Sequence, residues 1–126
     1  MRRSDQRRAA VFALYERQVR GAPPAAETPD PLKPFTRELV DGVEENRAAL
    51  DGEIGALAHG WDVERIAALE RSILRVALFE LHHRDDIPAE VAIDEAVGLA
   101  KRYCGAEAPG FVNGILAAAA RAEHSG

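Results

Sequence analysis

The sequence predicts an all-α fold, and three observations carry that prediction. Apolar residues recur at helical spacing in several segments, and no segment of the 126-residue chain alternates apolar and polar residues as a strand does. Proline and glycine gather in a few connecting stretches. Hydrophobic residues make up 47% of the chain, which is enough for a packed core. We therefore expect one domain over 1–126, made of an N-terminal half (1–60) and a C-terminal half (61–126) that share one core.

The first predicted helix is basic at its start and apolar along one face. Ser4 suits the N-cap, and the helix runs to about Arg20, where Gly21 ends it. Its expected apolar face consists of residues at helical spacing with two neighbours beside them: Phe12, Tyr15 and Val19, flanked by Val11 and Leu14.

A proline-rich loop and a long helical region complete the first half. The segment from Gly21 to Pro34 contains five prolines and is a predicted loop. The region over 35–58 follows, and its glycines predict a bend or a split. The residues expected to form its inner face are Phe35, Leu39, Val43, Leu50, Ile54 and Leu57.

The second half is expected to consist of a short helical turn and three helices. Prolines suit the first turns of two of them, and a glycine stops one. In chain order these are a turn over 63–67 capped by Asp62, a central helix from about Leu69 to Arg84, a helix from Pro88 to Gly105, and a last helix from Pro109 to about Arg121.

The central helix carries one charged residue where none is expected. Its apolar arc covers about half the circumference, which is typical of a helix in the middle of a bundle. Arg75 lies on the remaining open strip. Glu80 lies on the apolar side and near the helix C-terminus, where the macrodipole disfavours negative charge. Glu80 therefore needs a partner, either Arg84 one turn on or another molecule.

The charge is distributed unevenly along the chain. The net charge is −5, but residues 1–20 hold six arginines against two acids. Arginines at a helix N-terminus oppose the helix dipole, so they do not serve local stability. Together with free backbone N–H groups they would form a site for phosphate oxygens, although a solvated basic end is the alternative. The four arginines concerned are Arg2, Arg3, Arg7 and Arg8.

Several classes of function find no support in the sequence. The single cysteine, Cys104, excludes an internal disulfide framework and a zinc-thiolate cluster. The histidines lack metal-ligand spacing, and there is no glycine-rich phosphate loop or Ser-His-Asp set. There is no signal peptide and no apolar run of about twenty residues. We expect a cytoplasmic protein without catalytic residues, metal or cofactor.

The start of the last predicted helix offers a second candidate site. In Phe111-Val112-Asn113-Gly114, Phe111 would present a stacking face to an unpaired base and Asn113 a hydrogen-bonding edge. The structural alternative is close helix packing around Gly114, with Asn113 capping a neighbouring helix.

Taken in order, these segments resemble the NusB family of bacterial transcription antitermination factors. The resemblance runs through nearly the whole chain and implies two small helical bundles packed side by side. The segments that carry it are the arginine-rich start, Ala13-Leu14-Tyr15, residues 35–43, Trp61 with Arg65, residues 73–81, Pro88, residues 91–96, Leu99-Ala100-Lys101 and residues 111–114.

The resemblance implies an RNA-binding function without enzymatic activity. Such proteins bind the boxA element of rRNA leader transcripts together with the ribosomal protein NusE. They join the RNA polymerase elongation complex with other Nus factors, and support antitermination and rRNA maturation. By similarity, the expected RNA-binding residues are Arg2, Arg3, Arg7, Arg8, Arg75, Phe111 and Asn113, and the expected NusE-facing residues are Tyr15 and Glu80.

Three positions depart from the family pattern, and two alternative functions stay open beside the first. Gly110 stands where the family more often has a basic residue, Ala117 often where it has an acid, and Asp94 where Asn is more usual. One alternative is the NusB-like RNA-binding fragment of an rRNA cytosine methyltransferase. Another is a protein-interaction module in which the exposed part of the central helix drives homodimerisation.

Overall fold

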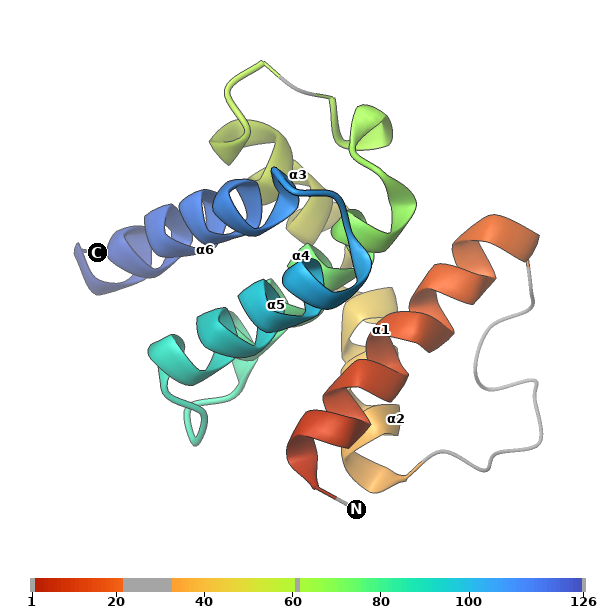
Figure 1. The fold of residues 1–126 in the computed structure, drawn as a ribbon. Coiled ribbons are helices and arrows are strands. Elements are labelled where there is room, and N and C mark those ends of the chain that lie inside the picture. Colours follow the sequence, from red (N-terminus) through yellow and green to blue (C-terminus); the bar gives the residue numbers. More distant parts are fainter. Residues whose placement is uncertain (1, 22–32, 61, 126) are drawn as a thin grey trace.

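The computed structural model describes residues 2–21, 33–60 and 62–125, and within these ranges all regular structure is helical (Figure 1). This confirms the predicted all-α class. The predicted loop falls almost entirely on residues 22–32, outside the described ranges. In chain order the elements are α1 (Arg3–Arg20), α2 (Pro34–Glu45), α3 (Arg47–Leu57), the 3-10 turn η2 (Val63–Arg65), α4 (Ala68–His83), α5 (Ala89–Tyr103) and α6 (Ala108–Ser125).

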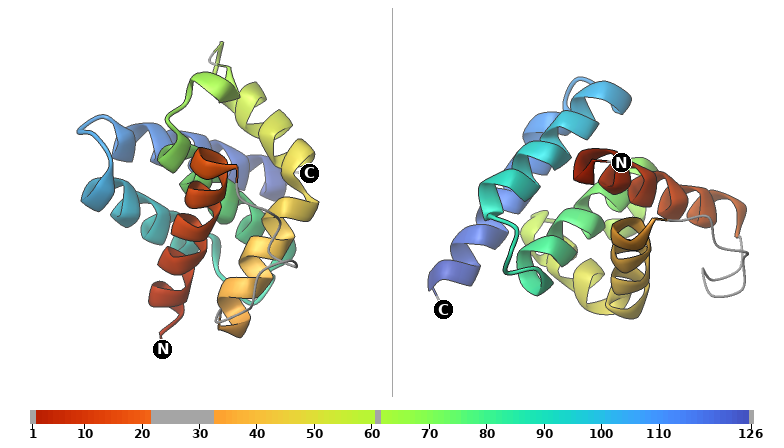
Figure 2. Two further views of the ribbon diagram at one scale, coloured as in Figure 1. Left: turned by 90° about the vertical axis from the view of Figure 1, so that its right-hand side faces the viewer. Right: turned by 90° about the horizontal axis from the view of Figure 1, so that it is seen from below.

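Helix α4 is the centre of the fold. It packs against each of the other α-helices described, with α1 and α2 on one side and the pair α5 and α6 on another (Figures 1 and 2). Helices α1 and α2 run in the same direction. Gln6 near the start of α1 accepts a hydrogen bond from the Phe35 backbone N–H at the start of α2, and Arg17 near the end of α1 pairs with Glu44. One core therefore joins both parts of the chain.

The predicted open strip on the central helix is wrong. Every residue from Ser72 to Glu80 is buried, including Arg75. Helix α1 covers Ser72, whose hydroxyl accepts a hydrogen bond from the Gln18 side-chain amide at 2.7 Å. Helix α3 covers Arg75 through Asp51. A helical wheel that is apolar over half its circumference indicates that the helix is central. It does not show that neighbouring helices also cover the polar residues on the other half.

Local details of the first half differ from the expectations. The residue before α1 is Arg2, and Ser4 lies inside the first turn, where its hydroxyl donates a hydrogen bond to the Glu95 carboxylate of α5. The long helical region does split, but at Asn46, whose side-chain amide donates to the Gly42 carbonyl at 2.8 Å. Gly21 ends α1 as predicted, with a φ of 65°.

Helix α1 buries the flank of the predicted apolar face, Val11 and Leu14, and not its middle. Its core residues are Ala10, Val11 and Leu14, whereas Val19 is 60% exposed. Phe12 and Tyr15 are half-buried. The side of α1 that carries Phe12, Tyr15 and Val19 therefore reaches solvent.

The crossing of α2 and α4 requires a glycine. A Cβ atom built on Gly42 would overlap the Phe79 ring, far inside van der Waals contact. Only a residue without a side chain lets the ring pack against the α2 backbone here.

None of the described helices has both the length and the apolar character needed to cross a bilayer.

Candidate nucleic-acid interface

The first turn of α1 presents positive charge to solvent. Arg2 is exposed and has no ion-pair partner among the described residues. Arg3 is about half exposed and donates one hydrogen bond to Asp86 at 3.2 Å. Arg8 is partly exposed and pairs with Asp5 on its own helix at 3.1 Å. The Arg2 side chain does not cap the helix, so first-turn N–H groups add to the positive field.

Arg7, one turn after Arg3, belongs to the core instead. Its guanidinium donates two hydrogen bonds to Glu80 of α4, Nε to Oε1 at 2.6 Å and Nη2 to Oε2 at 2.8 Å. Its Nη1 lies 3.3 Å from Glu95. Arg7 is 4% exposed and Glu80 is fully buried. Burial raises the pKa of the Glu80 carboxyl above its ordinary value, and the Arg7 hydrogen bonds oppose that shift.

Glu80, for which the sequence predicts a partner, is therefore paired inside the molecule. The partner is Arg7, 73 residues away, and not Arg84 or a second molecule. Direct contact of Arg7 with RNA, or of Glu80 with a protein, would first require breaking this pair. Because an unpaired buried charge is costly, the geometry favours a structural role for both residues.

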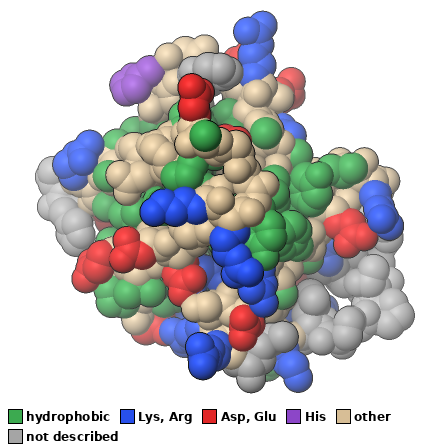
Figure 3. All heavy atoms as spheres, in the orientation of Figure 1, with side chains coloured by type: hydrophobic (Ala, Val, Ile, Leu, Met, Phe, Trp, Pro, Cys, Tyr) green, Lys and Arg blue, Asp and Glu red, His purple; other side chains and the backbone are tan. Residues whose placement is uncertain are grey.

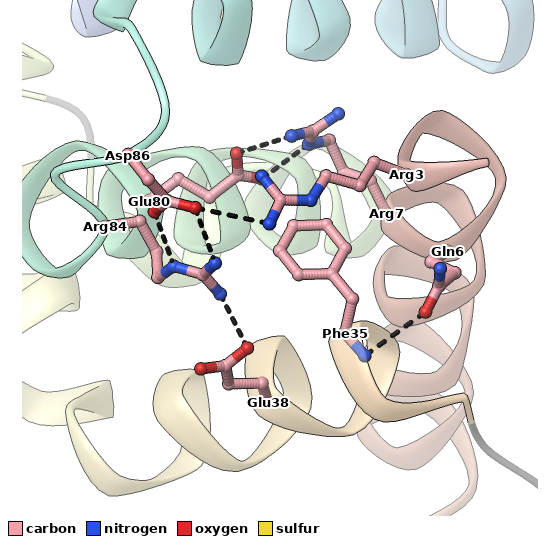
Figure 4. Close-up of polar contacts among 8 residues, drawn as sticks. All are labelled: Arg3, Gln6, Arg7, Phe35, Glu38, Glu80, Arg84 and Asp86. Atoms are coloured by element: carbon pink, nitrogen blue, oxygen red, sulfur yellow. Dashed lines mark hydrogen bonds and ion pairs between the residues drawn. The ribbon is translucent and has the colours of Figure 1, made fainter.

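A ring at the start of α2 gathers three guanidinium groups. Phe35 has the Arg3, Arg7 and Arg84 guanidinium carbons at 4.8, 5.6 and 5.2 Å from its ring centre (Figure 4). Cations over an aromatic face at this range are attracted by the ring quadrupole. Arg84 also pairs with Glu38, 2.6 Å away on α2. This cluster ties α1, α2 and the end of α4 together, and Arg3 is its half-exposed member.

Arg75 is likewise engaged internally. Its Nε and Nη2 donate to the two Asp51 carboxylate oxygens at 2.7 and 2.9 Å. Its side chain is 4% exposed, whereas that of Asp51 is 28% exposed. The pair fastens α3 to α4, so its guanidinium is not presented to a ligand in this arrangement.

Phe111 and Asn113 lie at a second place. Phe111 is half-buried and lines a cleft with Arg65, Glu70 and the connection between α5 and α6. Asn113 is exposed on α6. No α1 residue lines this cleft, and the views show the first turns of α1 and α6 at different ends of the molecule (Figures 1 and 2). The structure therefore does not join the two predicted RNA-binding groups into one compact site.

Tyr15 belongs to an accessible aromatic row between α1 and α5. Its ring meets Phe12 edge-on at 6.4 Å, and Phe12 meets Tyr103 edge-on at 4.9 Å. The neighbouring cleft between the two helices, with a volume of about 390 Å³, is lined by Arg8 and Arg102 among others. Figure 3 shows basic side chains along this face, interspersed with acidic ones and flanked by apolar side chains.

The described part of the chain contains no cluster of three or more histidine, cysteine or acidic side chains placed to hold a metal ion.

A model of the NusB family matches residues 4–121. The chain belongs to the NusB family. It is 42% identical over 124 residues to the transcription antitermination protein NusB of Rubrobacter xylanophilus, a match that covers 92% of this chain and 88% of the relative.

Solved NusB structures share the whole fold. T. maritima NusB superposes with a TM-score of 0.87 at 32% identity, covering 96% of this chain and 92% of that one. A structure of the antitermination factors NusB and NusE in complex with dsRNA matches with a TM-score of 0.83 at 25% identity, covering 95% and 96%. The predicted pairing of two small bundles is thus the NusB fold.

On this NusB framework, sequence reasoning missed residues that only the fold brings to the basic end. Arg84 and Asp86 come from the connection after α4, and Arg102 from the end of α5. The sequence indicates Arg84 only as a possible partner of Glu80. No spacing in the sequence links Arg102 with Arg8, because 94 residues separate two side chains that line one cleft.

Proposed function

We propose that this chain is an RNA-binding transcription antitermination factor. It binds the boxA element of rRNA leader transcripts together with ribosomal protein NusE, and joins the RNA polymerase elongation complex with other Nus factors. The observation that carries the proposal is the full-length likeness to NusB in a complex with NusE and dsRNA. Its role is binding and not catalysis, carried out in the bacterial cytoplasm where transcripts are made.

The accessible arginines at the start of α1, with Arg2 just before the helix, are the proposed phosphate contacts. Arg2, Arg3 and Arg8 combine side-chain charge with the positive end of a helix dipole. Arg7 acts behind this surface by holding α1 against α4, whereas Arg75 holds α3 against α4 beside the C-terminal part of α1. Phe111 and Asn113 form a separate candidate contact for an unpaired base.

Salt titration tests the phosphate contacts. Three contacts to single-stranded RNA predict a slope of log K against log salt of about −2. Replacing Arg2 and Arg3 with Ala should flatten that slope by about 1.4 and weaken binding to boxA RNA. The matched control replaces Arg20 and Arg47, two other exposed arginines, with Ala. If both double variants bind alike, the N-terminal arginines are not the RNA contacts.

Tyr15 is the proposed contact for NusE, and Glu80 is not, because Glu80 has no accessible surface. Titration of NusE with and without boxA RNA should show cooperative ternary assembly. Tyr15→Ser should weaken NusE binding while leaving binding of RNA alone unchanged. Equal NusE affinity for Tyr15→Ser and the wild type would remove Tyr15 from the interface.

Homodimerisation is the alternative assembly. Light scattering with and without boxA RNA distinguishes the two. A monomer that forms a ternary complex with RNA and NusE supports the proposal, whereas a dimer indifferent to RNA favours a self-association module.

A further inference from the structure

We propose that the Asp86 carboxylate is an internal competitor for RNA: it occupies, against Arg3 and Arg84, the place of a backbone phosphate, and bound RNA displaces it from Arg3. This inference rests on the proposed RNA-binding function. It adds an acidic residue, outside the basic N-terminus, that sets the affinity of that surface.

The contacts of Asp86 are those that a phosphate would make. Arg84 donates from Nε to Oδ1 at 3.0 Å and from Nη2 to Oδ2 at 2.9 Å, the paired arrangement in which a guanidinium binds carboxylates and phosphates. Arg3 donates to Oδ2 from the other side at 3.2 Å (Figure 4). The hydrogen bonds from Arg84, and to a lesser extent from Arg3, lower the pKa of Asp86 to about 2, so the carboxylate stays charged at neutral pH.

The two arginines hold Asp86 unequally. Arg84 is 15% exposed and is also fixed by Glu38 at 2.6 Å. The Arg3 and Asp86 side chains are about half exposed and share a single hydrogen bond. Exposed ion pairs of this kind are weak and are screened by salt. A phosphate that approaches α1 therefore meets little resistance when it replaces Asp86 at Arg3.

The aromatic ring beneath keeps the cationic site in place when the carboxylate leaves. Arg3 and Arg84 both lie over Phe35, a buried residue, at 4.8 and 5.2 Å. Their positions therefore do not depend on Asp86 alone. Without Asp86, Glu38 is the remaining carboxylate at Arg84, and Arg3 has no other carboxylate partner among the described residues.

The neighbouring Asp85 supplies a matched control. It is exposed, belongs to the same connection, and has no ion pair among the described residues. Asp85→Asn and Asp86→Asn change the net charge equally, so both alter the long-range attraction of RNA to a similar extent. The difference between them reports the local competition at Arg3.

The test measures binding of each variant to a single-stranded boxA RNA across a salt series. Asp86→Asn should bind about two- to fivefold more tightly than Asp85→Asn, the range expected for loss of an exposed ion pair. Its salt dependence should be steeper, because a displaced carboxylate no longer takes up a cation. In an Arg3→Ala background the advantage should vanish, since the competition acts through Arg3.

The outcomes separate this inference from the function on which it rests. Salt-dependent binding by the wild type with equal or weaker binding by Asp86→Asn than by Asp85→Asn overturns the competitor role and leaves the proposed function standing. An advantage of Asp86→Asn that persists without Arg3 also overturns it. A wild-type protein that does not bind RNA removes both proposals. Thermal unfolding of each variant verifies that the fold is retained.

Discussion

Arg3 and Arg7 lie one turn apart on the same helix, yet the fold gives them opposite environments. Arg3 is about half exposed and shares one 3.2 Å hydrogen bond with Asp86. Arg7 is 4% exposed and makes a two-point contact with a fully buried Glu80. An exposed arginine can exchange its ion-pair partner for a ligand, whereas a buried arginine holds two helices together. The burial of the side chain decides between these two roles.

The comparison also shows why a cluster of arginines overstates the charge available to a ligand. Four arginines fall in the first eight residues, but Arg7 is neutralised inside the core. The exposed positive charge at this end comes from Arg2, Arg3 and Arg8 together with the helix terminus.

The largest expected effect tests the buried pair. Arg7→Met leaves the Glu80 carboxylate buried without its partner and should lower the free energy of unfolding by about 3–5 kcal/mol in a urea titration. The double variant Arg7→Met with Glu80→Leu removes both charges and should recover most of that loss. A loss for Arg7→Met no greater than for Arg3→Met would refute the assignment of Arg7 to the core.

Arg75 sharpens the comparison as an intermediate case. Its side chain is 4% exposed, but its partner Asp51 is 28% exposed and can be solvated when left alone. Arg75→Met should therefore cost less than Arg7→Met, about 1.5–3 kcal/mol. The same urea titration checks the order. Arg47→Met, which alters the longer 4.0 Å contact to Asp51, is the control and should cost less still.

His82 adds an ion pair whose strength depends on pH. Its ring nitrogens face Glu53 of α3 and Glu123 of α6. Burial lowers the pKa of His82, but the two carboxylates outweigh burial and raise it above its ordinary value. The stabilisation is full below the unfolded-state pKa and is lost as pH rises through the raised folded-state pKa. His82→Gln should cost about 1 kcal/mol near pH 6 and less near pH 9. A pH-independent cost would show that His82 does not titrate in this contact.

The smallest effect on stability is expected for Arg3, the exposed arginine of the pair. Arg3→Met removes a weak surface pair and one partly exposed contact with the Phe35 ring, and should lower the free energy of unfolding by less than about 1 kcal/mol. Its RNA affinity should nevertheless fall, whereas Arg20→Met at the other end of α1 should change neither property. A marked loss of stability in Arg3→Met would place Arg3 in the same structural class as Arg7.

The sequence sufficed for the fold class and for the elements that hydrophobic periodicity defines. Helix α4 was predicted within a residue at each end, and its central position followed from the wide apolar arc. Glu80 was singled out because an acid on an apolar stripe must be compensated. These features are local, so a helical wheel contains them.

The candidate site was less predictable because its pairings are not local. The partner of Glu80 is 73 residues away on α1, and the partner of Arg75 is 24 residues away on α3. Both depend on how helices cross, which the periodicity of a single helix does not encode. The buried face of α1 was predicted only in part for the same reason. Val11 and Leu14 are in the core as expected, but the sequence alone does not show that Ala10 is buried more deeply than Phe12 and Tyr15.

A glycine on the buried face of α2 helps to set the geometry of the basic surface. Because Gly42 carries only hydrogen, the Phe79 ring rests against the α2 backbone. The same helix carries Phe35 and Glu38 to the guanidinium groups of Arg3 and Arg84. Even an added methyl group at position 42 would push α2 or the Phe79 ring aside. A substitution in the core would then lower the affinity for RNA although no residue of the basic surface is changed.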